Sequence, residues 1–189
     1  MKTENKTDQQ NQEADLIELI CRRDEKAFEL LYHRFYSRLF RFIARTTARP
    51  DHIDEVINDV MYVVWEKAHT YNRQCRPSTW IFGIAFNKAR QSLRNGNREA
   101  DQSFDEFESN TLIQASYDDG PTRIERDNWL EFALDVLSPE QRAVIELTYY
   151  QGLHYSEIAE LMGCSENTVK TRMHYARKKL VAFLKNSDY

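Results

Sequence analysis

Apolar residues recur every three to four positions along most of the chain, which is the spacing of amphipathic helices. This spacing predicts helix over residues 14–48, 52–68, 78–94 and about 121–137. A further helix is indicated from Ser138, because Ser-Pro-Glu-Gln combines an N-cap serine, a first-turn proline and a glutamine at the third helical position. No run alternates apolar and polar residues over a useful length, so the sequence predicts an all-α protein.

The predicted helices group into two small bundles joined by a tether. Residues 1–12 are polar and are expected to form a disordered tail. The first bundle spans residues 13–98, and an Asn-Gly-Asn turn signal at residues 95–97 is expected to end its last helix. Residues 99–120 contain acids and turn formers without a sustained period, which predicts a flexible acidic linker. The second bundle then covers residues 121–189.

The segment from residue 153 to residue 180 has the pattern of a helix-turn-helix. A short helix ends at Gly163, which supplies a tight turn, and Ser165 is placed to cap a second helix that begins at Glu166. The positions of the second helix that are expected to face the core are Val169, Met173, Ala176 and Leu180. The opposite face and its flanks carry Asn167, Lys170, Thr171, Arg172, His174, Arg177 and Lys178. In such a motif the second helix enters the major groove of DNA. The alternative is an ordinary helical hairpin with a lysine-rich end.

Charge is segregated along the chain, although the whole chain has a formal net charge of only −4. Residues 1–98 have a net charge of +4, residues 99–140 of −10 and residues 141–189 of +2. Residues 67–98 contain seven basic residues and no acid. Blocks of one sign indicate interaction surfaces, whereas a solvated helix face usually mixes both signs.

The basic stretch 67–98 also contains Tyr71, Trp80, Phe82 and Phe86. Basic surfaces with aromatic rings suit single-stranded nucleic acid, because every base offers a stacking face. The alternative for at least half of these rings is packing in the core. A polar helix face in the same stretch contains Thr79, Gly83, Asn87, Arg90 and Arg94, and its glycine would allow a backbone or a duplex to approach closely.

Acidic and amide residues cluster in the first half of the helix predicted over 52–68: Asp54, Glu55, Asn58 and Asp59. The helix dipole favours acids near an N-terminus, which accounts for Asp51 and is the alternative explanation for Asp54. Asp59 lies too far along the helix for that explanation and is expected to contact a basic partner.

Several classes of protein are excluded by what the sequence lacks. Cys21, Cys75 and Cys164 are scattered, which predicts reduced thiols and no zinc site. The N-terminus has no apolar signal-peptide core and no segment is long enough to insert in a membrane, so we expect a cytoplasmic protein. His52 lies near Asp54 and Asp59, but no HExxH or phosphate loop accompanies them. We therefore expect no catalytic residue, metal or cofactor.

Three segments together resemble bacterial RNA polymerase sigma factors of the extracytoplasmic-function (ECF) subgroup of the sigma-70 family. They are DHIDEVINDVMYVVW, STWIFGIAFNKARQSLR and LSPEQRAVIELTYYQGLHYSEIAELMGCSENTVKTRMHYARKKL. The resemblance covers about residues 16–98 and 121–185, and it implies that the first bundle is sigma region 2 and the second is region 4.

The resemblance also implies partners and roles. The partners are core RNA polymerase, through its β′ clamp helices and β flap, promoter DNA and, in many members of the subgroup, an anti-sigma factor. The expected clamp contacts are Asp54, Glu55, Asn58 and Asp59. The expected contacts to the −10 promoter element are Tyr71, Asn72, Arg73, Arg76, Asn87, Arg90 and Arg94. The basic face of the helix from Glu166 would read the −35 element.

Two residues depart from the pattern of the subgroup. His154 stands where a capping serine is common, and Tyr175 stands where an arginine is common in the recognition helix. The phosphate contact of that arginine is therefore not carried over to Tyr175.

The rival interpretation is a stand-alone helix-turn-helix regulator, which would bind palindromic DNA tightly without polymerase.

Overall fold

The computed structural model describes residues 2–46, 52–102, 133–134 and 136–186. All regular secondary structure within these ranges is helical, which confirms the predicted all-α fold. The helices of the first bundle are α1 (Lys2–Cys21), α2 (Glu25–Thr46), α3 (Ile53–Lys67), the 3₁₀ turn η2 (Ala68–Thr70) and α4 (Pro77–Gln102). Those of the second bundle are α6 (Pro139–Ile145), the π-helical turn η3 (Glu146–Tyr150), α7 (Tyr155–Met162) and α8 (Glu166–Asn186).

The first bundle is built around aromatic side chains from α2 and α4. Phe35, Phe42 and Phe82 are fully buried. The ring of Phe82 meets Phe42 edge-on at a centroid distance of 5.2 Å and lies 6.4 Å from the ring of Phe35. Phe86 is also buried, so the packing interpretation holds for Phe82 and Phe86.

Two helix boundaries differ from those predicted at the N-terminal end. The prediction of a disordered tail over residues 1–12 is wrong for residues 2–12, which are helical in α1. Residues 8–12 lack apolar side chains, and the helix propagates from an anchored part in which Ile17 and Ile20 are buried. The helix expected over 14–48 is interrupted, because Arg23 adopts a left-handed φ of 64° and the Asp24 carboxylate accepts a hydrogen bond from the Ala27 amide.

The helix α4 is longer than predicted. It continues through residues 95–97 to Gln102, four residues into the predicted linker. A glycine inside a helix costs only about 1 kcal/mol, so a single Asn-Gly-Asn sequence does not force the helix to end. The remainder of the predicted linker, residues 103–120, lies outside the described residues.

The caps and the turn of the second bundle form as its sequence predicts, whereas most of the helix predicted over residues 121–137 lies outside the described residues. Ser138 and Gln141 form a reciprocal capping box at the start of α6. Gly163 ends α7 in the left-handed conformation with a φ of 63°. The Ser165 hydroxyl accepts a hydrogen bond of 3.1 Å from the Thr168 amide and so caps α8.

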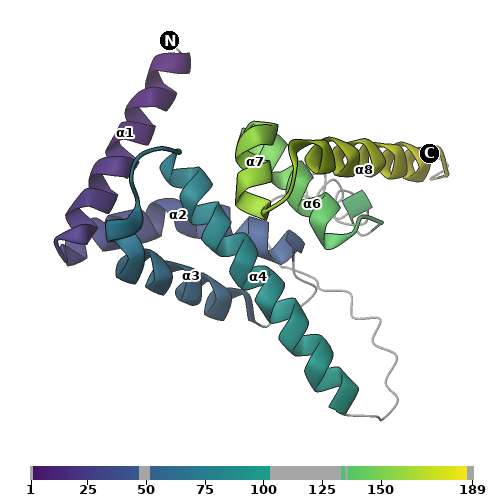
Figure 1. The fold of residues 1–189 in the computed structure, drawn as a ribbon, viewed down its shortest axis with the longest axis horizontal. Coiled ribbons are helices and arrows are strands. Elements are labelled where there is room, and N and C mark those ends of the chain that lie inside the picture. The colour runs from purple at the N-terminus through teal and green to yellow at the C-terminus, as the bar shows by residue number, and fades with distance from the viewer. Residues whose placement is uncertain (1, 47–51, 103–132, 135, 187–189) are drawn as a thin grey trace, which may run out of the picture.

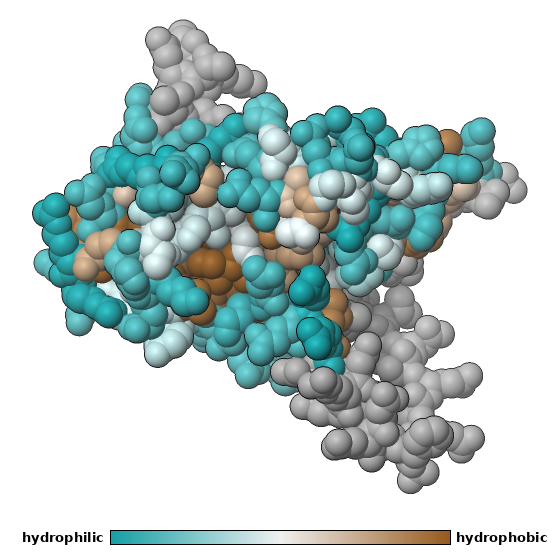
Figure 2. Space-filling view, viewed as in Figure 1, coloured by the Kyte–Doolittle hydropathy of each residue, from teal (hydrophilic) through white to brown (hydrophobic). Residues whose placement is uncertain are grey.

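The two bundles lie against each other, with α7 beside α4 and α6 beside α2 (Figure 1). The buried apolar residues of both bundles form one continuous cluster. Figure 2 shows that hydrophilic side chains cover most of this face of the molecule and that hydrophobic ones are visible mainly near its centre. Within the described residues, no helix is long and apolar enough to cross a membrane.

Candidate nucleic-acid interface

The helix α8 presents a polar face to solvent because its apolar residues are in the core. Val169, Met173 and Ala176 are buried, as predicted. The side chains of Asn167, Lys170, Thr171, His174, Arg177 and Lys178 are exposed. Tyr175, the departure noted above, is 52% exposed on the same helix, and its ring meets that of His174 at 5.5 Å. The polar face that the sequence predicted for this helix is therefore exposed to solvent.

Two arginines of this helix have partners inside the bundle. Arg177 donates a hydrogen bond of 2.7 Å to the hydroxyl of Tyr149. Arg172 is only partly exposed, and its guanidinium lies 3.7 Å from the Cys164 sulfur and 3.9 Å from the Met162 sulfur. Arg172 therefore lies at the turn of the motif rather than on the open face.

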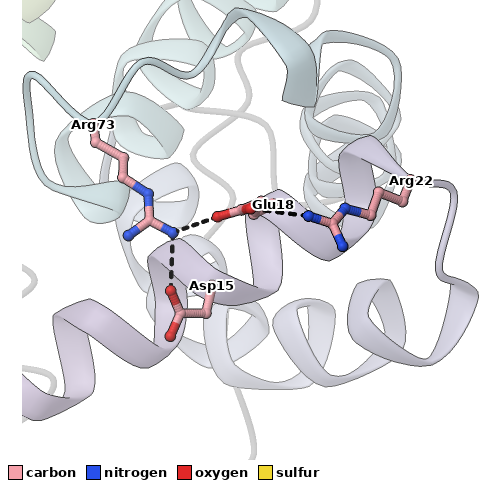
Figure 3. A network of polar contacts seen from close by, with 4 residues as sticks. All are labelled: Asp15, Glu18, Arg22 and Arg73. Carbon is pink, nitrogen blue, oxygen red and sulfur yellow. Dashed lines mark hydrogen bonds and ion pairs between the residues drawn. The ribbon is translucent and has the colours of Figure 1, made fainter.

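In the loop between η2 and α4, Arg73 contacts the helix α1. Arg73 has a left-handed φ of 60°, and its guanidinium contacts the carboxylates of Asp15 at 2.9 Å and Glu18 at 2.7 Å on α1. Glu18 also pairs with Arg22, so a network of four charged side chains ties the loop to α1 (Figure 3). Hydrogen bonding to Asp15 raises the pKa of Arg73. A phosphate would have to displace these carboxylates.

Tyr71 shapes the same loop. Its hydroxyl donates to the Cys75 carbonyl at 2.8 Å, and its ring lies 5.4 Å from that of Trp80. Burial raises the pKa of Tyr71 to about 12. Asn72 is exposed, and its side-chain oxygen accepts a hydrogen bond from the Gln74 amide at 3.1 Å. Tyr71 thus supports the loop, whose exposed side chains include Asn72 and Arg73.

The polar face of α4 is partly covered by the second bundle. Thr79 donates a hydrogen bond of 2.9 Å to Glu157, which also pairs with Arg76 at 3.5 Å. The close approach predicted at Gly83 is made by α7, because a Cβ on this residue would lie 3.6 Å from the Leu161 side chain. Of the predicted −10 residues, Asn87, Arg90 and Arg94 are exposed farther along α4.

The predicted polymerase-binding residues lie along the exposed side of α3, and each has a partner. Tyr36 donates to Asp54 at 2.7 Å, and Tyr32 donates to Asn58 at 3.1 Å. Glu55 lies 2.8 Å from the imidazole of His52. The basic partner expected for Asp59 is present within the chain, since the Lys88 ammonium pairs with it at 2.9 Å.

This chain matches two family models, Sigma-70 region 2 over residues 31–99 and Sigma-70, region 4 over residues 127–180. The ECF RNA polymerase sigma factor SigL of Mycobacterium tuberculosis is 31% identical to it over 152 residues, which are 79% of this chain and 84% of that relative. The chain belongs to the ECF sigma factors of the sigma-70 family. It is therefore an alternative sigma factor for transcription initiation.

Other comparisons agree with this placement. The ECF sigma factor SigK of Mycobacterium sp. (strain KMS) is 26% identical over 162 residues, 84% of this chain and 83% of that protein. The structure of RpoE with the anti-sigma factor NepR from Bartonella quintana matches the sigma factor with a TM-score of 0.71 at 24% identity, covering 86% of this chain and 99% of that one. CnrH in complex with the cytosolic domain of CnrY matches with a TM-score of 0.68 at 22% identity, covering 94% of this chain and 99% of that one. Both share its fold.

Sequence reasoning missed the side chains that join the two regions of the sigma factor. Arg45 of α2 donates a hydrogen bond of 2.6 Å to Glu146 of η3, whose side chain is 1% exposed. Burial raises the pKa of Glu146, and the charge of Arg45 acts against that rise. Burial alone would lower the pKa of Arg45, but the charge and hydrogen bond of Glu146 more than offset it, so that pKa is raised.

A second arginine of α2 spans the same boundary. Arg38 donates hydrogen bonds of 3.1 and 2.9 Å to Gln151, and it also pairs with the buried Glu13 at 3.3 Å. Burial lowers the pKa of Arg38 and raises that of Glu13. One signal for this boundary was present in the sequence, because Glu146 interrupts an apolar run and a lone acid there indicates a buried ion pair.

The part of the sigma factor that the structure describes contains no group of three or more His, Cys, Asp or Glu residues able to hold a metal ion. His52, Asp54 and Asp59 lie on or beside α3, and each has the partner given above.

Proposed function

We propose that this sigma factor reads the −35 promoter element with α8, within region 4 over residues 121–189. The observation that carries the proposal is the exposed polar face of α8 behind a buried apolar stripe. Asn167, Thr171 and His174, which are exposed near the start of this face, would meet base edges in the major groove. Lys170, Lys178 and Arg177 would neutralise phosphates, and Arg172 would contribute through the turn.

Region 2, over residues 13–98, would bind the −10 element. The exposed loop residues Asn72 and Arg73 would contact a base extruded from the non-template strand, with Tyr71 supporting the loop from behind. Arg76, Asn87, Arg90 and Arg94 would contact the upstream edge. Opening duplex costs roughly 1.4 kcal/mol per stacked step, and capturing one base returns about 1–3 kcal/mol. Capture of a few bases therefore supports local melting.

The α3 surface would dock on the β′ clamp helices of core RNA polymerase. Asp54, Glu55, Asn58 and Asp59 project from one exposed helix side and already accept hydrogen bonds or ion pairs. Region 4 would sit on the β flap. The nucleotidyl transfer belongs to the polymerase, so the sigma factor itself performs no catalysis.

An anti-sigma factor is a further proposed partner. RpoE of Bartonella quintana, which shares this fold, is a sigma factor in complex with the anti-sigma factor NepR, and CnrH, which also shares it, is in complex with the cytosolic domain of CnrY.

Run-off transcription tests the function directly. Purified sigma factor is added to core RNA polymerase with a library of promoter-like fragments, and the active fragments are sequenced. We expect transcripts that depend on the sigma factor and share two conserved elements.

The rival function is a stand-alone regulator. It predicts no sigma-dependent transcript together with tight binding of the free protein to palindromic duplex, with half-sites one helical turn apart. That pair of results would overturn the proposal.

A further inference from the structure

The loop between η2 and α4, residues 71–76, is the proposed base-capture loop, and its arginine is tied to α1. Asp15 and Glu18 lie three positions apart on α1 and therefore share one face of the helix. Both carboxylates accept a hydrogen bond from the same nitrogen of Arg73, Nη2, at 2.9 and 2.7 Å (Figure 3). Ile17, which lies between them in the sequence, is buried. The guanidinium is therefore held from a part of α1 that is anchored in the core.

The backbone of the base-capture loop is fixed by contacts within the protein. Arg73 has a left-handed φ of 60°, which costs a residue with a side chain free energy that its surroundings must offset. Within the loop, the Tyr71 hydroxyl donates to the Cys75 carbonyl. The Gln74 amide donates to the side chain of Asn72. The two ion pairs of Arg73 attach this preformed turn to α1, so they set both the place and the direction of the arginine.

The two carboxylates orient the guanidinium of Arg73 and leave half of the side chain exposed. Hydrogen bonds to a guanidinium lie in its plane, because all five of its N–H donors do. Both contacts are made through Nη2, and the side chain of Arg73 remains 50% exposed. A base can stack on such a plane or accept hydrogen bonds from its other nitrogens, which are two ways in which proteins bind unstacked bases. The contacts to α1 are thus compatible with capture of a base.

The charges around Arg73 disfavour a phosphate at the same place. Arg22 pairs with Glu18 at 3.2 Å, so the network of two arginines and two carboxylates is neutral as a whole (Figure 3). A phosphate that approaches Arg73 also meets Asp15 and Glu18, and their repulsion offsets the attraction of the arginine. A base is neutral and meets no such repulsion. The arrangement therefore favours a base over the phosphate backbone.

We propose that Asp15 and Glu18 are positioning residues for base capture. They hold the guanidinium of Arg73 toward the base extruded from the −10 element, and their charges make this arginine a poor ligand for phosphate. This inference rests on the proposed function, because it concerns the base that the same loop would capture. It assigns a role in promoter specificity to α1, a helix with none of the residues expected to contact DNA.

Base discrimination by the holoenzyme tests the proposal. Promoter fragments with each of the four bases at every −10 position compete for core RNA polymerase carrying either wild-type sigma factor or the Asp15→Asn, Glu18→Gln variant. We expect the variant to lose about fivefold in discrimination at one −10 position, the lower end of what a single position contributes. Discrimination at the −35 element should not change. The matched control is Glu66→Gln, which removes an ion pair of 3.0 Å with Arg23 between side chains of similar exposure.

A second variant separates base capture from a phosphate contact. Arg73→Lys keeps the positive charge and loses the guanidinium plane. We expect it to lose discrimination at the same −10 position as the double variant. Arg73→Ala should leave the slope of log affinity against log salt concentration unchanged, because a contact to a base displaces no counterion. Full discrimination by Arg73→Lys, or a slope shallower by about one in Arg73→Ala, would show that this arginine contacts phosphate and would overturn the proposal.

The alternative role of Asp15 and Glu18 is only to restrain a phosphate contact of Arg73. In that case the double variant binds all fragments more tightly, with a steeper salt slope and unchanged discrimination at every −10 position. Unchanged discrimination overturns the positioning role, and so does an equal loss of binding to all fragments, which would indicate a structural defect. If the wild-type holoenzyme shows no preference at any −10 position, the proposed function of region 2 fails instead.

Discussion

The side chains proposed to bind DNA differ in whether they already have partners. Arg73, Arg76 and Arg177 each contact a group inside the protein. The side chain of Lys178, in contrast, is exposed on the open face of α8. An arginine that must give up an internal partner gains less binding free energy from a phosphate than a side chain that gives up only water. Lys178 is therefore the better probe of the interface.

We expect Lys178→Ala to weaken holoenzyme binding to all promoter fragments by a similar factor. The slope of log affinity against log salt concentration should become shallower by about one. The reason is that a lysine contacts phosphate without reading sequence. The measurement is promoter affinity over a series of salt concentrations. Lys26→Ala, on the exposed start of α2, serves as the control and should leave the slope unchanged.

The thiol of Cys75 has a different environment from that of Cys21. Burial raises the pKa of Cys75, whereas Cys21 is exposed. The thiolate is the reactive form, so less of it is present at neutral pH at Cys75. We expect iodoacetamide to alkylate Cys75 more slowly than Cys21 at pH 7.5, and the rate at Cys75 to keep rising above the pH at which an ordinary thiol levels off. Mass spectrometry of timed digests measures both, and equal rates would contradict the prediction.

At the scale of helices, short capping sequences fix the geometry of region 4. The capping box at Ser138, the left-handed Gly163 and the cap at Ser165 all lie within the described part of the chain. The π-helical turn η3 adds one residue to the helical winding between α6 and α7, since the Gln151 amide donates to the Glu146 carbonyl. Its residues Glu146, Tyr149 and Tyr150 meet arginines of α2 and α8.

We expect Ser165→Ala to fray the first turn of α8. An N-cap serine contributes about 0.5–2 kcal/mol, so the free energy of unfolding should fall by that amount and affinity for the −35 element should fall with it. Urea titration and binding to a −35 fragment measure the two effects. Ser37→Ala, an exposed mid-helix change in α2, is the control for losing a hydroxyl. Unchanged −35 affinity would show that the start of α8 does not contact the element.

At the scale of the whole molecule, one buried cluster runs through both regions. Phe82 belongs to this cluster and lies against Phe35 and Phe42 and under the guanidinium of Arg38, which reaches Gln151 of region 4. Arg38 is therefore one of the side chains that connect the core of region 2 to the boundary with region 4.

We expect Phe82→Ala to lower the free energy of unfolding by about 3–5 kcal/mol, because a large buried ring is replaced by a cavity. Urea titration followed by circular dichroism measures the change. Tyr62→Ala, whose ring is 65% exposed, should alter stability by less than about 0.5 kcal/mol. Comparable losses for both variants would contradict this account of the core.

The sequence by itself determined the helices, the caps of region 4 and the polar face of α8, because each depends on residues within about one or two turns. Val169, Met173 and Ala176 are buried as their spacing predicted. The residues at which α1 begins and α4 ends could not be predicted from the neighbouring sequence, because an anchored helix continues into polar sequence at little cost in free energy.

Only the tertiary structure decided which charges meet. Glu146 and Arg45 are 101 positions apart, and no periodicity within the chain relates them. Gly83 was predicted to admit a close neighbour, and the fold made that neighbour Leu161. Long-range pairing depends on how two bundles pack, which the local pattern leaves open. The residues proposed to face the promoter could therefore be named from sequence, but the contacts of Arg76 and Thr79 with Glu157 of region 4 could not.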